Sequence, residues 1–258
     1  QYNSIQGIVH TLPILPPAPN DAKSWVDTAA RQNLNLLASN YAVSSAEQTL
    51  KQRKAGHLPT LDAVAKYEKG DNDALGFANP NAFGTPYGGN VEQSTLGLQL
   101  NIPIYSGGLT SSQVRESYSR LDQTEQQREA LRRQVVENTR NLHRAVNTDV
   151  EQVQARRQSI ISNQSAVEAT EIGYQVGTRN IVDVLDAQRQ LYTSVRNYNN
   201  TRYDYILDNL RLKQAAGTLN PGDLEDLRRY LKADYNPDKD FLPPDLAKAA
   251  EAQLRARP

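Results

Sequence analysis

Apolar residues recur at helical spacing in three long stretches of the chain, residues 22–55, 109–172 and 181–216. The second stretch carries a series with a spacing of seven, which consists of Val114, Leu121, Arg128, Val135 and Leu142. At a rise of 1.5 Å per residue this helix would be roughly 95 Å long, which exceeds any ordinary helix of a globular domain. The pattern therefore predicts a mainly α protein built from a few long helices.

The second helix is poorly suited to a simple two-stranded coiled coil. The companion positions of its series are half polar, namely Ser117, Thr124, Leu131, Asn138 and Ala145. Residues 109–174 also carry nine Arg and nine Asp or Glu. A two-stranded coiled coil needs apolar residues at both sets of positions. The sequence is typical instead of one helix in a wall, held on its flanks by neighbours while two faces stay in water.

A period of two replaces the helical pattern between the first and second helices. The alternating apolar residues are Leu61, Ala63, Ala65 and Tyr67 in one run and Leu96, Leu98, Leu100, Ile102 and Ile104 in the next. Each run is close to the roughly 9–11 residues of a tilted transmembrane strand. Aromatic residues gather near the strand ends, as in membrane barrels, at Tyr67, Phe77, Phe83, Tyr87 and Tyr105. A half-buried hairpin of a soluble protein would show the same alternation, so the pattern alone leaves both structures open.

Proline and glycine mark the boundaries between these elements. Gly56 and Pro59 end the first helix, Gly107 and Gly108 end the second strand, and Gly217 ends the last long helix. A loop over residues 70–90 separates the strands. We expect a short helix over 224–231 and a weak one over 246–255. The predicted segments are a Pro-rich connector (1–20), a helix (21–58), two strands with their loop (59–106), a long helical hairpin (107–217), a turn with a short helix (218–231) and a poorly ordered tail (232–258).

The stretch from Gly173 to Asp186 connects the two longest predicted helices. Gly173 and Gly177 are the only glycines between Gly108 and Gly217, which indicates a turn. Asn180 is a candidate N-cap, with Asp183 three residues later in a variant of the capping box.

Asp183 and Asp186 lie on one face of the first helical turns. Acids at this position favour the helix dipole. Arg179, four residues before Asp183, could form a local ion pair contributing under about 1 kcal/mol.

Composition excludes several classes of function. The chain is 38% hydrophobic, with 29 basic and 29 acidic residues, so nothing indicates a nucleic-acid surface. It has no cysteine, and His10, His57 and His143 are isolated, so we expect no metal site and no cofactor. Gly107-Gly108 lacks the Lys-Ser/Thr of a phosphate loop, and no nucleophile elbow is present. We predict that the protein is not an enzyme.

Several motifs, taken together, resemble the TolC-type outer-membrane channel proteins of efflux and type I secretion systems. The matching residues are Gly56 to Leu61, Pro103 to Gly108, Tyr174, Val176 to Arg179, Ile181 to Asp186, Leu191-Tyr192, Arg202 to Tyr205 and Gly217 to Asn220. The resemblance spans roughly residues 20–230 in the family's order. It covers the C-terminal half of such proteins and the connector before it, so we expect this sequence to be a piece of a longer chain that begins with a signal peptide.

The resemblance implies a fold and partners. The fold would be mainly α with a β-hairpin contribution, in which long helical hairpins form a trans-periplasmic tunnel and strands contribute to a trimeric outer-membrane β-barrel. Three copies would act with a periplasmic adaptor (membrane fusion) protein and an inner-membrane transporter to export small molecules, proteins or both. The lipid-facing residues would be Leu96, Leu98, Leu100, Ile102 and Ile104. The alternative is a soluble periplasmic coiled-coil adaptor or structural protein of the same machines.

The resemblance also implies roles for the turn and its flanks. Asp183 and Asp186 match residues that ring the tunnel's narrowest point and attract cations. Tyr174 and Arg179 match residues that hold this aperture closed by bonding to neighbouring helices. Residues Val176, Gly177, Thr178 and Arg179 would form the tip that adaptors contact.

Overall fold

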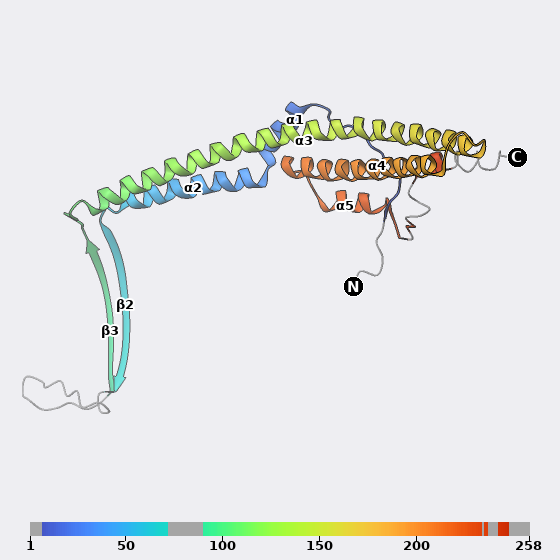
Figure 1. Ribbon diagram of the computed structural model, residues 1–258. Coiled ribbons are helices and arrows are strands. Elements are labelled where there is room, and N and C mark those ends of the chain that lie inside the picture. Colours follow the sequence, from blue (N-terminus) through green and yellow to red (C-terminus); the bar gives the residue numbers. More distant parts are fainter. Residues whose placement is uncertain (1–6, 72–89, 234, 237–241, 248–258) are drawn as a thin grey trace, which may run out of the picture. The chain divides into compact units, whose positions relative to one another are not determined.

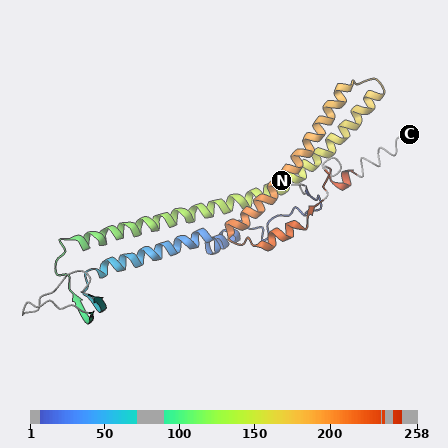
Figure 2. The same ribbon diagram turned by 90° about the horizontal axis from the view of Figure 1, so that it is seen from below.

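A computed structural model describes residues 7–71, 90–233, 235–236 and 242–247 (Figures 1 and 2). The chain divides into two compact units, Gln1–Asn40 with Gln127–Pro258 and Tyr41–Gln126. The elements, in order, are β1 (Gly7–Ile8), α1 (Ala22–Gln32), α2 (Leu34–Ala55), β2 (Thr60–Asp71), β3 (Asn90–Asn101), α3 (Leu109–Gln175), α4 (Ile181–Ala216), α5 (Pro221–Arg228) and β4 (Leu231–Lys232). The predicted fold class, mainly α with a β-hairpin, is confirmed.

The prediction of one continuous helix over residues 22–55 is wrong, because Asn33 interrupts it. Asn33 is extended, with ψ 119°, and separates α1 from α2. Its side-chain oxygen accepts a hydrogen bond from Leu36 N at 3.0 Å, and its Nδ2 donates to the carbonyl of Ala215 at 2.9 Å. The side chain therefore caps α2 and also fastens the break to the end of α4. A contact 182 residues away in the sequence, rather than local propensity, sets this boundary.

In the smaller unit, β2 and β3 pair antiparallel over 12 residues each. Apolar residues pair across the strands, as in Leu61 with Leu100 and Ala63 with Leu98. Ile102 and Ile104 lie beyond the end of β3, so the predicted strand was too long; Pro103 between them has no N–H to continue the ladder. Tyr67 and Tyr105 are exposed, whereas Phe77, Phe83, Tyr87 and the loop over 72–89 lie outside the described residues.

The core of the larger unit lies between α3 and α4, which run side by side in both views (Figures 1 and 2). It contains two clusters of buried residues. The first consists of Leu12, Val146, Val150, Tyr205, Ile206 and Leu212, and the second of Val153, Ile160, Val195, Tyr198 and Leu246. Leu246 belongs to the predicted tail, and its neighbour Asp245 forms an ion pair with Arg157. Residues 237–241 and 248–258 of that tail lie outside the described residues.

Residues 7–15, which we call the N-terminal strap, are fixed to α4 by two buried side chains. The Tyr205 hydroxyl donates to the carbonyl of Leu15 at 2.8 Å and accepts from its N–H at 3.1 Å. Arg202 is only 3% exposed, and its guanidinium donates to the carbonyl of Val9 at 2.6 Å. Burial lowers the pKa of Arg202 from its ordinary value. The strap has no helix, as predicted for the Pro-rich connector, yet it is packed against the core.

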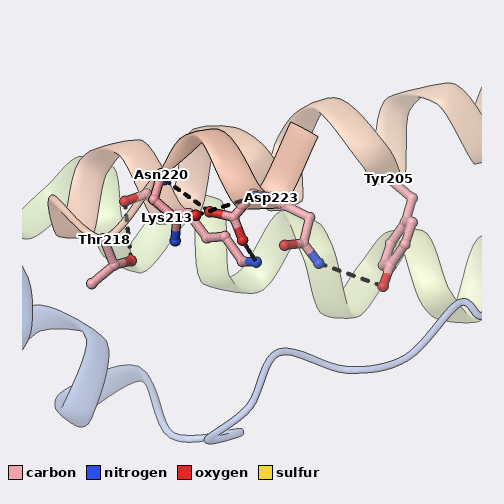
Figure 3. Close-up of polar contacts among 6 residues, drawn as sticks. Tyr205, Lys213, Thr218, Asn220 and Asp223 are labelled. Carbon is pink, nitrogen blue, oxygen red and sulfur yellow. Dashed lines mark hydrogen bonds and ion pairs between the residues drawn. The ribbon is translucent and has the colours of Figure 1, made fainter. Parts of the chain in front are cut away.

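The short helix α5 begins earlier than predicted. Asn220 and Asp223 form a capping box, and Pro221 occupies the first turn, so the helix starts at residue 221 rather than 224. Lys213 Nζ donates to Asp223 Oδ1 at 2.6 Å, which ties α5 to the end of α4 (Figure 3). This hydrogen bond from Lys213 holds the pKa of Asp223 below its ordinary value. Gly217 joins the two helices with a φ of 74°.

Gly217 is expected to tolerate a side chain less well than Gly177, although both have positive φ, 74° and 78°. An added Cβ at Gly217 would overlap the carbonyl of Gln32, whereas at Gly177 it would meet open space. Gly177→Ala should cost about 1–2 kcal/mol of unfolding free energy from backbone strain. Gly217→Ala should cost roughly a further 1–3 kcal/mol from overpacking. Equal losses in urea titrations of the two variants would show that the Gln32 contact does not constrain this joint.

Candidate functional site

The turn between α3 and α4 is closed by the backbone of Gly173. Its carbonyl accepts hydrogen bonds from Thr178 N at 2.8 Å and from Arg179 N at 3.1 Å, and a third from the Thr178 hydroxyl at 3.0 Å. Gly177 has a φ of 78°, which is the left-handed conformation of a helix C-terminus. The predicted turn is confirmed. An added Cβ at Gly177 would meet open space within the described residues. Glycine is therefore favoured there by its positive φ and not by close packing within the chain.

The two acids of the tip have different surroundings. Asp183 completes the predicted capping box, because its N–H donates to Asn180 Oδ1 at 2.9 Å and its Oδ2 accepts from Asn180 N at 3.2 Å. Asp186 is exposed and forms an ion pair with Arg189 at 3.0 Å. Among the described residues, Arg179 forms no ion pair with Asp183, so the alternative of a local pair is not realised in this structure. The guanidinium of Arg179 is therefore not occupied by that carboxylate.

Large apolar side chains around the tip are exposed. They are Ile172, Val176, Ile181, Val182 and Leu185, and Tyr174 is 48% exposed. Grouped apolar exposure on this scale is typical of a surface that another chain or segment covers. Tyr174 and Arg179 flank the same turn, and both are exposed there.

One face of the strand hairpin is apolar across both strands. Because directly paired residues point to the same side of a sheet, the register gathers Leu61, Ala63 and Ala65 of β2 with Leu100, Leu98 and Leu96 of β3. The opposite face carries the pairs Asp62 with Gln99, Lys66 with Thr95 and Glu68 with Gln93. The apolar side chains are exposed, Leu96 by 87% and Leu98 by 76%. A two-stranded hairpin with one uncovered apolar face needs a partner or an apolar solvent.

We also searched the described residues for a metal site and for membrane-spanning helices. They contain no group of three or more His, Asp or Glu side chains that could hold a metal ion. None of their helices is both long enough and apolar enough to cross a membrane.

Arg202 and Tyr205, which anchor the strap, were not predicted as structural anchors. The signal available was their place in the resembling run Arg202 to Tyr205, which indicated a role without indicating its geometry.

Comparison with known proteins gives a consistent result. Residues 25–218 match the family described as "Outer membrane efflux protein". The chain is 35% identical over 227 residues to Outer membrane protein TolC of Escherichia coli K12, covering 88% of this chain and 46% of that protein. It is 38% identical over 211 residues to Outer membrane protein TolC of Vibrio cholerae, covering 82% and 47%. The chain thus spans about half the length of the curated relatives it matches.

A more distant relative and a solved structure extend the comparison. The chain is 26% identical over 223 residues to Proteases secretion protein PrtF of Dickeya chrysanthemi, covering 86% of this chain and 46% of that protein. Its fold is similar to that of the Campylobacter jejuni CmeC outer membrane channel, with a TM-score of 0.63 at 20% identity, over 79% of this chain and 42% of the other. At this identity the likeness supports the fold alone.

The two tip acids should differ in their effect on local stability. Asp183→Ala removes the carboxylate of the capping box and should lower the local stability of the start of α4 by roughly 0.3–1.5 kcal/mol. Asp186→Ala removes only an exposed ion pair and should change it by less than about 0.5 kcal/mol. Amide hydrogen exchange of residues 181–186 measures both. Equal protection in the two variants would mean that the capping box does not stabilise the tip.

Proposed function

The chain belongs to the outer membrane efflux protein family, and from this premise we propose that it supplies half of a subunit of an outer-membrane export channel. The observation that carries the proposal is the hairpin of β2 and β3. Its apolar side chains lie on one face of both strands in register, and they have no cover among the described residues. Each strand has 12 residues, enough for the roughly 9–11 of a tilted membrane strand.

Closure of a barrel requires more strands than the described residues provide. Within this part of the chain β2 and β3 form a sheet of two strands, so the outer edge of each has unpaired N–H and C=O groups, which are costly in lipid. We propose that the other half of the subunit and two further subunits supply the missing strands, so that three copies close one barrel. The face with Leu96, Leu98 and Leu100 would meet lipid, and the face with Gln99 the lumen. Ile102 and Ile104, past the end of β3, would lie at the membrane boundary.

The hairpin of α3 and α4 would form part of the tunnel wall in the periplasm. The thin core and the many charged side chains of α3 suit a helix that contacts neighbours on its flanks and water on its other faces. The family is described as outer membrane efflux protein, and one relative is named for protease secretion. We therefore assign an export role without a chemical reaction, for small molecules, proteins or both, together with a periplasmic adaptor and an inner-membrane transporter.

The tip would be both the aperture and the adaptor contact. Asp186 is exposed and Asp183 partly so, and three subunits would bring six carboxylates to one constriction that attracts cations. Tyr174 and Arg179 would hold the aperture closed through bonds to neighbouring helices. Arg179 is exposed and forms no ion pair among the described residues, which supports this role. The exposed turn from Val176 to Arg179, which includes Gly177 and Thr178, would contact the adaptor.

The lipid-facing assignment predicts unequal effects of arginine on the two faces of β3. Leu98→Arg should cost roughly 2–4 kcal/mol near the bilayer midplane. Gln99→Arg should be mild, because the new cation would lie opposite Asp62 on the other face. Ala63→Arg is the matched control on β2, since Ala63 pairs with Leu98, and should resemble Leu98→Arg. Refolding of the full-length protein into bilayers measures these costs, and comparable damage from all three would contradict the assignment. A soluble adaptor, the second candidate, would refold without lipid.

The aperture assignment predicts changes in single-channel recordings of the full-length protein. Replacing Asp183 and Asp186 together by Asn removes the charge while an amide oxygen can still cap α4. This variant should lose cation selectivity and block by multivalent cations. Replacing Tyr174 and Arg179 together by Ala should increase conductance.

Asp226→Asn is the control, because Asp226 is an exposed acid of α5 outside the tip. The aperture assignment is wrong if both double variants conduct like the control.

A further inference from the structure

Asp149 of α3 carries a carboxylate in an unusual position. It lies one turn from Val146 and beside Val150, two residues of the first core cluster that faces α4. The side chain is half-buried, and its Oδ2 atom is buried without a hydrogen-bond partner among the described residues. A buried acceptor of this kind costs free energy when it is charged, because water is lost and nothing replaces it.

The charged groups that face Asp149 from α4 make ionisation harder still. Asp208 and Asp204 are both acids, and both raise the pKa of Asp149 by charge repulsion. Burial contributes the largest part, and together these effects raise the pKa of Asp149 to about 6. Arg211, a cation of α4, forms an ion pair with Asp208 at 2.8 Å. The N-terminal strap contributes Leu12 to the same cluster, which has no charge.

We propose that Asp149 is a proton-responsive contact between α3 and α4. When the carboxyl is protonated, it is neutral and the two helices pack closely around it. When it is ionised, its charge is desolvated and repelled by Asp204 and Asp208, so the helices separate more easily at this level. This contact concerns the packing of α3 against α4, and it does not depend on the tip being a channel aperture.

The sign of the pH effect follows from proton binding. The folded state binds the proton of Asp149 more tightly than the unfolded state, whose pKa is close to the ordinary 3.8. Stability from this group is therefore fully present below about pH 4, falls as pH rises and is lost above about pH 6. The acids of the tip lie beyond the second core cluster along α4, away from Asp149.

The experiment compares the full-length wild-type protein with Asp149→Asn, which has nearly the same shape and no charge. Thermal unfolding midpoints should agree at about pH 3.5, below both pKa values, and the variant should melt several degrees higher at about pH 7.5. The difference should develop between about pH 4 and about pH 6, the range between the ordinary pKa of an aspartate and the pKa of folded Asp149. Asp226→Asn, which removes an exposed acid of α5, is the matched control and should show no such difference.

Infrared difference spectroscopy observes the proton directly and does not depend on stability. The wild type should show the carbonyl band of a protonated carboxyl at pH values where ordinary aspartates are ionised, and Asp149→Asn should lack it. If Asp149→Asn does not assemble, Asp208→Asn tests the proposal instead. Loss of one repelling charge should lower the pH at which the carboxyl band of Asp149 disappears. The proposal is overturned if the band is absent from the wild type, or if the difference in melting does not depend on pH.

Discussion

The structure is constrained by apolar surface that remains exposed to solvent in the described residues. The hairpin of β2 and β3 exposes both faces and both outer edges, and a two-stranded sheet of this kind is at best marginally stable in water. Around the tip, Tyr174, Val176 and Leu185 are likewise exposed. In the function proposed above, other chain segments, other copies and lipid would cover these surfaces.

Within the larger unit, a few long-range contacts position the helices that carry the tip. Asn33 fastens the break between α1 and α2 to the end of α4, and Gly217 allows the backbones to approach there. Arg202 and Tyr205 fix the N-terminal strap across α4, and Lys213 with Asp223 fixes α5. These contacts all lie on the side of α4 away from the tip or along its middle. Within the described residues, the tip is closed by the hydrogen bonds of its own turn and by its capping box.

Periodicity in the sequence was sufficient to predict the long helices and the hairpin, because both patterns extend over many residues. The start of α4 was also predictable, since Asn180 and Asp183 form a local motif. Asn33, Arg202 and Tyr205 could not be assigned from sequence, because their partners are far along the chain. The raised pKa of Asp149 likewise comes from burial in the folded protein and from two acids on another helix. Ile102 and Ile104 continue the alternation but not the strand, because Pro103 cannot extend the ladder. The roles of the tip residues were expected from family resemblance and remain predictions.

Contact of lipid with the apolar face of the hairpin can be measured directly. This sequence has no cysteine, so single cysteines can be introduced one at a time along β2 and β3 for spin labelling. In the full-length protein reconstituted in vesicles, labels at positions 61, 63, 96, 98 and 100 should be relaxed by oxygen, which dissolves in lipid. Labels at 62 and 99 should be relaxed by a water-soluble nickel chelate. We expect this alternation, with a period of two residues, if one face meets lipid and the other meets water. Uniform access of the nickel chelate at every position would contradict it and would place the hairpin in water.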